Sequence, residues 1–562
     1  MSKAAIYQIF YSAQTCTQLD PGFLALDNTS NERPDWREYW PMRRFLLRES
    51  LRPETYYGFF SSKFGAKTGL TSVTVHELIE HHAADADVIS FSPYLEHSTF
   101  FRNSFEQAVA CHGQLDVFRQ CAALIAPEFR VEQSVMTSLD TIFCNFFVAK
   151  PEFWREWLRH AERLFQIAEE GSTPLARTLN AVSRYSIVPE GGSADPAAGP
   201  NPASLRDIPG VPLKVFVIER LASLLLWSNP QWKVKSLNHL TSSSGSPWPP
   251  ELFVLDALKI AYRRTGTSSY LDTFDALRRQ ATARYTRFVG DTAARINTVN
   301  PSPQWMLLHK SVPAETSSPS ARSSQTSDSG PERIRIVCAT RRTREQFVTD
   351  TQLGHSLSAL IPPNVELRLF PNNSRGLPAI YNVAIEESRV NPAILLFIHD
   401  DVYLNDVFWS DRLRESLDHF QLIGVIGNRR RAPRQPSWLF RAIYATDDTL
   451  VPDDPENLSG TVTYGDGLIP KSVDAWGPPR QSVKLLDGLF LAARSTTLQE
   501  RMLRFDERFD FHFYDLDFCR QAERAGLEMG TWPISVTHGS AGNLRSAAWR
   551  RSYDCYLDKW VD

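Results

Sequence analysis

Short apolar runs alternate with helical segments along the C-terminal part of the chain, and this alternation limits the fold more than any other feature. Strands are predicted at residues 334–339, 365–370 and 393–398, and helices after Thr343 and at 378–388. Apolar, β-branched runs of this length, separated by helical periodicity, are typical of βαβ units. The pattern therefore predicts an α/β fold with a sheet that is at least partly parallel.

The N-terminal half shows the same kind of pattern. Apolar runs occur at residues 4–10, 56–60 and 88–91, and helical segments are predicted at 75–82, 151–169, 214–227 and 251–264. A chain of 562 residues is also too long for one typical domain of about 150 residues. We interpret the two halves as two copies of one architecture.

Residues 311–331 separate the two halves. Ser, Thr, Pro and Gly dominate this segment, and Val312 is its only aliphatic residue larger than Ala. Such a segment cannot bury enough apolar surface to offset its ordering entropy. We therefore expect an N-terminal domain with a helical C-terminal part over residues 1–295, a Ser/Pro-rich linker over 296–332 and a C-terminal domain over 333–562. A second break at 189–209 predicts a loop within the N-terminal half.

Charge and cysteine content exclude several classes of protein. The 61 Lys and Arg residues nearly balance the 64 Asp and Glu residues, so no overall positive field draws the chain to nucleic acid or anionic lipid. The seven cysteines form no Cys-x-x-Cys pair, which argues against a disulfide framework and for a reducing compartment. Because no apolar run reaches about 20 residues and the start is unlike a signal peptide, we expect a soluble, cytoplasmic protein.

The sharpest local feature is His399-Asp400-Asp401, which directly follows the apolar run at 393–398. Ligands of open α/β sheets bind outside the carboxyl ends of the strands, which is where these carboxylates are expected. Two acids there can hold a hard divalent cation that shares its other ligand positions with water and substrate phosphate. The alternative is a solvated acidic pair in an ordinary turn.

Two further polar features lie nearer the C-terminus. Acids alternate with aromatic residues over residues 505–520, before a helix that ends near Gly526. Asp515 or Asp517 is a candidate general base in an aromatic-walled cleft, or else an acid that stabilises a helix N-terminus. His538 follows an apolar run at 533–537, as a candidate ligand or as a structural or simply exposed histidine.

In this order, the features resemble a known enzyme family. Residues 333–562 resemble a nucleotide-sugar-dependent glycosyltransferase of the GT-A fold, close to the large inverting family 2 and its bacterial surface-polysaccharide branch. The shared landmarks are the strand at 334–339, Pro371-Asn372-Asn373, residues 376–382, His399-Asp400-Asp401, residues 486–491, Tyr514-Asp515-Leu516-Asp517 and His538. The resemblance implies a Rossmann-like mixed sheet flanked by helices, in two tandem GT-A-like domains.

The resemblance also implies a role for each matching residue. Asp401 and His538 would hold Mg²⁺ or Mn²⁺ against the donor phosphates, and Asp515 would be the general base. His399 stands where the family's first motif Asp is usual, so Asp400 is the substitute, and Tyr514 stands where Glu is usual. The implied nucleotide-sugar residues are Thr340, Arg341, Arg342, Asn372, His399 and Asp400, and the implied acceptor residues are Asp487, Gly488, Tyr514 and Asp517.

Residues 1–290 resemble, more weakly, a glycosyltransferase-like domain of bacterial polysaccharide clusters. The motifs are residues 27–34, 38–44, 56–60 and 144–151, and a Glu-Arg-Leu helix at 216–221. Asp85-Ala86-Asp87 has Asp-x-Asp spacing but precedes the strand at 88–91, which puts it at the wrong edge of a sheet for a ligand site. This half is therefore expected to be metal-independent or non-catalytic.

These observations lead to three hypotheses. The first is a tandem or bifunctional glycosyltransferase that transfers a sugar from a nucleotide sugar to a glycan or lipid-linked glycan of a bacterial capsule or O-antigen (lipopolysaccharide). It would act in the cytoplasm, with the inner face of the membrane as an alternative location. The second keeps only the C-terminal domain active, with an N-terminal scaffold or acceptor-binding domain. The third is a carbohydrate-binding assembly protein with a decayed transferase fold, against which Asp401, Asp515 and His538 together argue.

Overall fold

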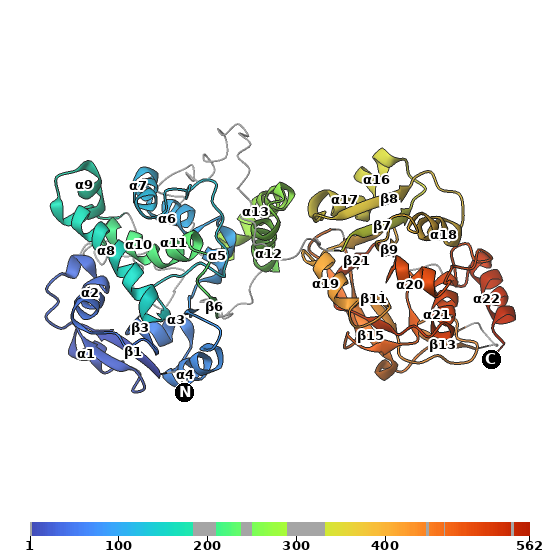
Figure 1. Cartoon of the computed structure of the whole chain (residues 1–562), viewed down its shortest axis with the longest axis horizontal. Helices are drawn as coiled ribbons and strands as arrows, with labels where there is room; N and C mark the ends of the chain where they lie inside the picture. Colours follow the sequence, from blue (N-terminus) through green and yellow to red (C-terminus); the bar gives the residue numbers. More distant parts are fainter. Residues whose placement is uncertain are drawn as a thin grey trace, which may run out of the picture. The chain divides into compact units, whose positions relative to one another are not determined.

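The chain forms two compact units. A computed structural model describes residues 3–183, 210–237, 250–288, 332–444, 449–465, 467–540 and 544–561 (Figure 1). One unit comprises Met1–Ile260 with Leu277–Ser318, and the other comprises Ala261–Ala276 with Pro319–Asp562. The linker expected at 296–332 lies outside the described residues except for Glu332, and the loop expected at 189–209 lies wholly outside them.

The N-terminal unit is built on a six-stranded mixed sheet among its described residues. In chain order the strands are β1 (Lys3–Phe10), β2 (Leu24–Asp27), β3 (Thr55–Ser61), β4 (Val88–Ser90), β5 (Phe147–Ala149) and β6 (Val234–Ser236). Their order across the sheet is β2-β1-β3-β5-β4-β6. β5 is antiparallel to both of its neighbours, and the other pairs are parallel.

Helices pack around this sheet. They are α1 (Ala13–Cys16), η1 (Pro34–Trp36), α2 (Tyr39–Arg48), α3 (Phe64–Thr68), α4 (Ser72–His82), α5 (Leu95–Phe100), α6 (Ser104–His112), α7 (Leu115–Ile125), α8 (Pro151–Glu170), α9 (Pro174–Asn180), α10 (Leu213–Glu219) and α11 (Leu221–Ser228). Two further helices follow, α12 (Pro250–Thr265) and α13 (Ser268–Phe288).

The C-terminal unit contains a seven-stranded sheet among its described residues. Its strands in chain order are β7 (Ile334–Ala339), β8 (Val365–Phe370), β9 (Ile394–Ile398), β11 (Leu422–Gly424), β17 (Ser482–Val483), β19 (Phe490–Arg494) and β20 (Met529–Thr531). The order across the sheet is β17-β20-β11-β19-β9-β7-β8. β7 is parallel to β8 and β9, and β11 to β20, whereas β19 is antiparallel to both of its neighbours.

A second sheet lies beside it and carries part of the site described below. Its strands are β10 (Val402–Leu404), β12 (Ile426–Asn428), β15 (Leu458–Tyr464), β16 (Ser472–Gly477), β18 (Leu485–Leu486) and β21 (Val536–His538). β13 (Phe440–Ile443) and β14 (Leu450–Pro452) form a hairpin. The helices are α16 (Arg344–Asp350), α17 (Gln352–Leu360), α18 (Leu377–Glu387), α19 (Trp409–Ser416), α20 (Ser495–Glu500), α21 (Tyr514–Arg524) and α22 (Ala547–Lys559), with a short η2 (Pro455–Asn457).

The two main sheets have the same topology. Numbered in chain order and leaving out the edge strand β17, the C-terminal strands follow the order 2-1-3-5-4-6, as the N-terminal strands do. The parallel and antiparallel pairs fall at the same places in both sheets. The predicted α/β class with two tandem units of one architecture is therefore confirmed.

Most predicted elements agree with the observed ones, but one predicted helix is broken. The segment 214–227 forms α10 and α11, which meet at Arg220. The Arg220 guanidinium is buried and donates from Nε to the Ser104 carbonyl at 2.8 Å and from Nη1 to the Phe216 carbonyl at 2.7 Å. These bonds hold the side chain inside the unit where the chain turns. No helix among the described residues is long and apolar enough to cross a membrane.

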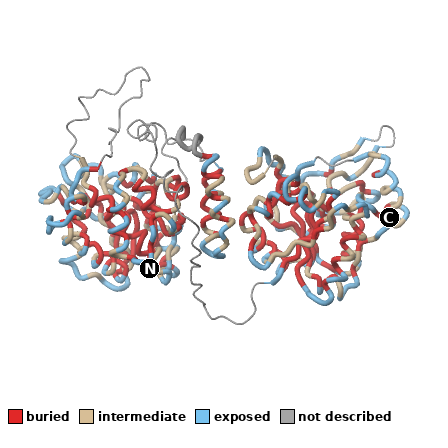
Figure 2. The backbone as a smooth tube through the Cα atoms, turned by 90° about the horizontal axis from the view of Figure 1, so that it is seen from above, coloured by how far each residue is buried: buried red, intermediate tan, exposed pale blue. Residues whose placement is uncertain are grey.

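β9 forms the centre of the C-terminal core. All five of its residues are fully buried, and the hydrophobic cluster around it includes residues of β7, β19, α18 and α21. Figure 2 shows the buried segments running through the interior of each unit. The residues that follow β9 are therefore held at a fixed edge of the sheet.

Truncation inside β9 is expected to destabilise the C-terminal unit. Leu396→Ala removes a fully buried side chain and should lower the free energy of unfolding by about 2–5 kcal/mol, measured by urea unfolding. Val390→Ala, at a side chain that is 83% exposed, is the control and should change it little. Equal effects of the two variants would contradict the central place of β9.

Candidate functional site

Strand pairing brings Asp401 and His538 together. β10 begins at Val402, directly after Asp401, and pairs antiparallel with β21, where Val402 lies opposite His538. His538 Nε2 lies 3.5 Å from Asp401 Oδ2, and the Gly539 amide donates to the Asp401 carbonyl at 2.8 Å. His538 was expected after a strand at 533–537, but it is the last residue of β21 because it takes part in this ladder.

His399 completes a group that can hold a metal ion. One ligand atom from each of His399, Asp401 and His538 lies within 4.8 Å of the others. Asp401 Oδ1 is buried and has no hydrogen-bond partner among the described residues, so this oxygen is available to a ligand. Imidazole and carboxylate are both ligands of divalent metals. The chemistry of the three side chains thus fits a divalent ion.

Burial and neighbouring charges shift the pKa values of all three candidate ligands, downward for Asp401 and His399 and upward for His538. Burial alone would raise the pKa of Asp401, but His538, His399 and Ser540 outweigh it and lower the pKa to about 2. Burial lowers the pKa of His399, against the charge of Asp401, which favours the neutral imidazole that binds metals. Burial also acts to lower the pKa of His538, but Asp401 outweighs it and the net shift is upward.

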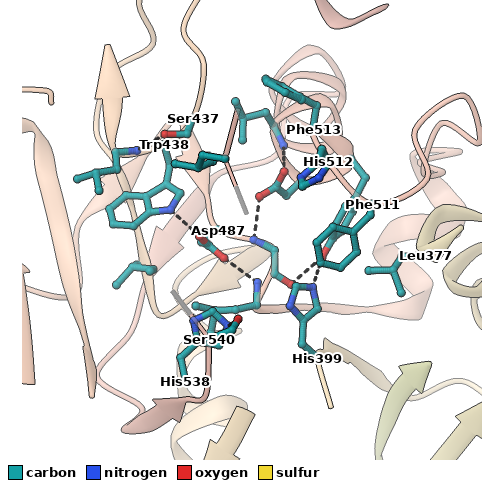
Figure 3. A pocket seen from close by; sticks show the side chains of 18 of the residues that line it. Leu377, His399, Ser437, Trp438, Asp487, Phe511, His512, Phe513, His538 and Ser540 are labelled. Carbon is teal, nitrogen blue, oxygen red and sulfur yellow. Dashed lines mark hydrogen bonds between the residues drawn. The ribbon is translucent and has the colours of Figure 1, made fainter. Parts of the chain in front are cut away.

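Hydrogen bonds define the tautomer of His399. The Tyr514 hydroxyl donates to the Gly488 carbonyl at 2.8 Å and lies 2.8 Å from His399 Nε2. Because the hydroxyl has one hydrogen, it accepts from His399 Nε2–H, which leaves the lone pair of the ring on Nδ1. Phe511 stacks against the imidazole, with ring centroids 5.6 Å apart (Figure 3).

Gly488 is required by the close approach of α21. A Cβ at this position would lie 2.3 Å from the Tyr514 hydroxyl oxygen and 3.1 Å from Asp515 Cβ, distances that real Cβ contacts do not reach or rarely reach. The Gly488 amide donates to Asp515 Oδ2 at 3.0 Å. This glycine therefore fixes both the tyrosine that orients His399 and the neighbouring carboxylate.

Asp515 has the electrostatic character of a general base. Burial and the nearby charge of Asp487 raise its pKa to about 7, against the amides of Leu516 and Gly488, which lower it. The Leu516 amide donates to Asp515 Oδ1 at 2.9 Å. A carboxylate with this pKa can accept a proton at neutral pH more readily than an ordinary aspartate.

Asp487 is held in place by a residue that the sequence did not reveal. Trp438 donates from Nε1 to Asp487 Oδ2 at 2.5 Å, and the Leu489 amide donates to Oδ1 at 2.8 Å (Figure 3). Trp438 follows a loop rich in Arg and Pro and belongs to no recognisable spacing. The one available signal was its aromatic character, which does not distinguish a site residue from a core residue.

These side chains line one cavity of about 510 Å³. The sequence-predicted residues that line it are His399, Asp400, Asp401, Asp487, Gly488, Tyr514, Asp515 and His538. Trp438, Trp476, Tyr381 and Phe511 supply aromatic walls.

The predicted nucleotide residues lie partly at this cavity. Thr340 Oγ1 donates to Asp400 Oδ2 at 2.6 Å, and Thr340 is buried at the end of β7. Arg341, Arg342 and Asn372 are exposed and do not line the cavity, but the Asn372 amide donates to the Arg342 carbonyl at 2.9 Å. The three exposed residues therefore lie outside the cavity, in two neighbouring loops that follow β7 and β8.

Asp517 lies away from the cavity. It is fully buried, and its carboxylate accepts from Trp560 Nε1 at 2.8 Å and Gln521 Nε2 at 2.7 Å. Lys559 Nζ lies 2.6 Å from Asp517 Oδ1. Asp517 thus anchors the end of α22 to α21, and this use of its carboxylate leaves no oxygen facing an acceptor.

One family model matches the chain. Residues 355–537 match the family described as "Glycosyltransferase like family". The matched segment is less than half of the chain, lies within the C-terminal unit, includes His399, Asp401 and Asp515, and ends one residue before His538. The C-terminal unit therefore contains a glycosyltransferase-like domain. No curated protein matches this chain in sequence.

Solved structures give only distant likenesses. A197 from STIV is 10% identical over 37% of this chain and 82% of its own, with a TM-score of 0.19. TarS 1–349 of S. aureus is 13% identical over 37% of this chain and 60% of its own, with a TM-score of 0.22. GalNAc-T7, solved with UDP, GalNAc and Mn²⁺, is 10% identical over 42% of this chain and 49% of its own, with a TM-score of 0.25. The chain thus spans less than two thirds of the last two, and likenesses at these TM-scores carry no argument.

Removal of the Asp401 carboxylate is expected to weaken metal binding. Asp401→Asn should raise the Kd for Mn²⁺, measured by isothermal titration calorimetry on the full chain, at least about tenfold, because a neutral amide replaces the one anionic ligand of the group. Asp558→Asn, at an exposed carboxylate of α22, is the control and should bind as the parent does. Unchanged binding in Asp401→Asn would exclude the metal site.

Proposed function

We propose that the C-terminal unit transfers a sugar from a nucleotide sugar to a hydroxyl acceptor, with a divalent metal ion and with inversion at the anomeric carbon. The observation that carries the proposal is the arrangement around one cavity: His399, Asp401 and His538 can hold a metal ion, and Asp515, with a pKa of about 7, lines the same cavity. The family match over residues 355–537 supports the sugar-transfer class.

The metal group is assigned to the donor phosphates. Asp401 and His538 would hold Mg²⁺ or Mn²⁺, and the geometry supports adding His399, which the sequence assigned to the nucleotide sugar. When bound, the ion supplies positive charge that stabilises the departing diphosphate. Tyr514 orients His399 through its hydroxyl, and the Asp400 carboxylate, held by Thr340, is proposed to contact the sugar or ribose.

Asp515 is assigned as the general base. Its carboxylate would accept the proton of the acceptor hydroxyl as the hydroxyl oxygen bonds to the anomeric carbon and the bond from that carbon to the phosphate oxygen breaks, with its electron pair passing to the diphosphate. One such displacement inverts the anomeric centre. Asp487, Gly488 and Tyr514 are proposed to shape the acceptor side, because they surround Asp515 in the cavity.

The acceptor class and the location rest on the sequence resemblance. It supports a glycan or lipid-linked glycan of a bacterial capsule or O-antigen, reached from the cytoplasmic side. Arg341, Arg342 and Asn372 remain proposed contacts of the nucleotide, at the loop pair beside Thr340.

Loss of the base is expected to slow transfer. Asp515→Asn should lower kcat for release of nucleoside diphosphate, measured with a panel of UDP-, GDP- and dTDP-sugars and Mn²⁺, by a factor of about 10²–10⁴. Asp558→Asn is again the control and should retain activity. Full activity in Asp515→Asn, or in the parent with excess EDTA, would refute the proposed function.

The same carboxylate should set the acid limb of the pH profile. Because Asp515 must be deprotonated and its pKa is raised to about 7, kcat should fall as the pH drops below about 7, by about tenfold per pH unit. Asp487→Asn removes a like charge that raises this pKa, so the limb should move to lower pH. A limb that stays in place in Asp487→Asn would exclude the coupling of the two carboxylates.

A further inference from the structure

Two indole rings form a wall beside the carboxylates of the C-terminal cavity. The Trp438 indole, which donates to Asp487, packs edge-to-face against Trp476 of β16, with ring centroids 5.6 Å apart at an angle of 84°. Both side chains line the cavity. Trp438 is only 7% exposed, whereas Trp476 is half-buried, so Trp476 offers the more accessible surface to a ligand.

The loop that carries Trp438 is held from several sides. Asn428 Nδ2 donates to the Trp438 carbonyl at 2.9 Å. Ser437 Oγ accepts from the Phe440 amide at 3.0 Å. Residues 436–440 all line the cavity. The wall is therefore in place before a ligand enters, which lowers the cost of binding a rigid ring against it.

The cavity is acidic and carries no lysine or arginine. The carboxylates that line it are Asp400, Asp401, Asp487 and Asp515. Among the described residues, no Lys or Arg lines it. The residues after 332 that lie outside the described ranges include no Lys or Arg either. A ligand with a negative charge would thus meet carboxylates and no basic side chain.

The other groups of the cavity do not supply a free positive charge. Burial lowers the pKa of His512, which keeps this imidazole neutral at neutral pH. The charge of the ion proposed at His399, Asp401 and His538 would be balanced by Asp401 and by the donor diphosphate. A carboxylate or phosphate on the acceptor sugar would instead face Asp487, and like charges in a buried site oppose each other.

An uncharged sugar matches both surfaces. Ionised carboxylates only accept hydrogen bonds, and sugar hydroxyls can donate to Asp487 and Asp515. One face of a pyranose ring carries C–H groups with a small positive charge, and such groups pack favourably on the negative face of an indole. The acids and Trp476 therefore recognise complementary parts of one neutral ring.

We infer that the acceptor sugar is an uncharged pyranose, whose C–H face packs on Trp476 and whose hydroxyls face Asp487 and Asp515. The site then discriminates against acceptor sugars that carry a carboxylate or a phosphate. This inference rests on the proposed function, because it names the acceptor class of the same reaction. It concerns the sugar inside the cavity, and charged groups elsewhere on a longer acceptor would lie outside it.

Matched pairs of acceptors test the inference. Release of nucleoside diphosphate by the full chain is measured with UDP-, GDP- and dTDP-sugars and Mn²⁺, alone and with methyl glycosides of glucose, galactose and mannose or of the corresponding uronic acids. Each pair differs only in a carboxylate in place of a hydroxymethyl group. At least one neutral glycoside should accelerate release, with a kcat/KM at least about tenfold above that of its uronide.

Two substitutions of Trp476 test the stacking surface. Trp476→Ala should raise KM for the neutral glycoside at least about tenfold and leave release without acceptor unchanged, and Trp476→Phe, which keeps a ring, should recover most of the loss. Val473→Ala is the control, at a side chain of β16 that is 58% exposed and does not line the cavity. The comparison of acceptor pairs in the parent chain needs no variant and stays decisive if thermal unfolding shows that Trp476→Ala does not fold.

Asp487→Asn tests the charge discrimination. It removes one of the like charges, so the ratio of kcat/KM for the neutral glycoside to that for its uronide should fall. Effects on the general base cancel in this ratio. Release that no neutral glycoside accelerates, faster transfer to a uronide, a KM unchanged in Trp476→Ala or a ratio unchanged in Asp487→Asn would overturn the inference. Failure of the proposed function is seen separately, as a lack of Mn²⁺-dependent release from every donor in the parent chain.

Discussion

The antiparallel pairing of β10 with β21 is the interaction on which the C-terminal site depends. It places His538 opposite Val402, so a histidine near the end of the chain lies beside the carboxylate that follows β9. β15 pairs with β21 from the other side, which holds this strand between two neighbours. A Cβ at residue 539 would lie 3.1 Å from the Asp401 carbonyl oxygen, so Gly539 permits the close approach of the two backbone segments. The geometry of the three candidate ligands is therefore a property of the ladder and of the buried strand before it.

Parts of the fold and site with a strong local signal could be predicted from the sequence. β7, β8 and β9 have five or six residues with clear apolar runs. Asp401 follows β9, Asp515 lies in the first turn of α21, and His538 ends an apolar run. The strands of three residues, such as β5, β6 and β10, carry too few residues for a period to emerge. Contacts between residues that are far apart in the chain could not be predicted from the sequence either. Asp517 looks locally like another helix N-terminal acid, but its partners Lys559 and Trp560 come some forty residues later, and Trp438 reaches Asp487 from a loop without a motif.

The neighbouring carboxylates of Asp487 and Asp515 accept hydrogen bonds from different groups. Asp487 accepts from the Trp438 indole and the Leu489 amide, and Asp515 accepts from the amides of Gly488 and Leu516. Like charges in one buried site oppose each other's ionisation, and this repulsion adds to burial in raising the pKa of Asp515. Asp401 has the opposite environment, because two histidines surround it and lower its pKa. One cavity thus holds Asp401, which stays ionised, and Asp515, whose pKa lies near neutral pH. The first property suits cation binding, and the second suits proton acceptance.

The shared topology of the two units separates what the sheet determines from what the side chains determine. The order 2-1-3-5-4-6 brings the end of the third strand and the start of the fifth to the same place in both units, and a cavity lies there in each, of about 510 Å³ in the C-terminal unit and about 50 Å³ in the N-terminal unit. Its chemistry follows from only a few positions. Carboxylate and imidazole after β9 create a group that gains its positive charge from an ion, and its affinity therefore depends on free metal and on ligand protonation.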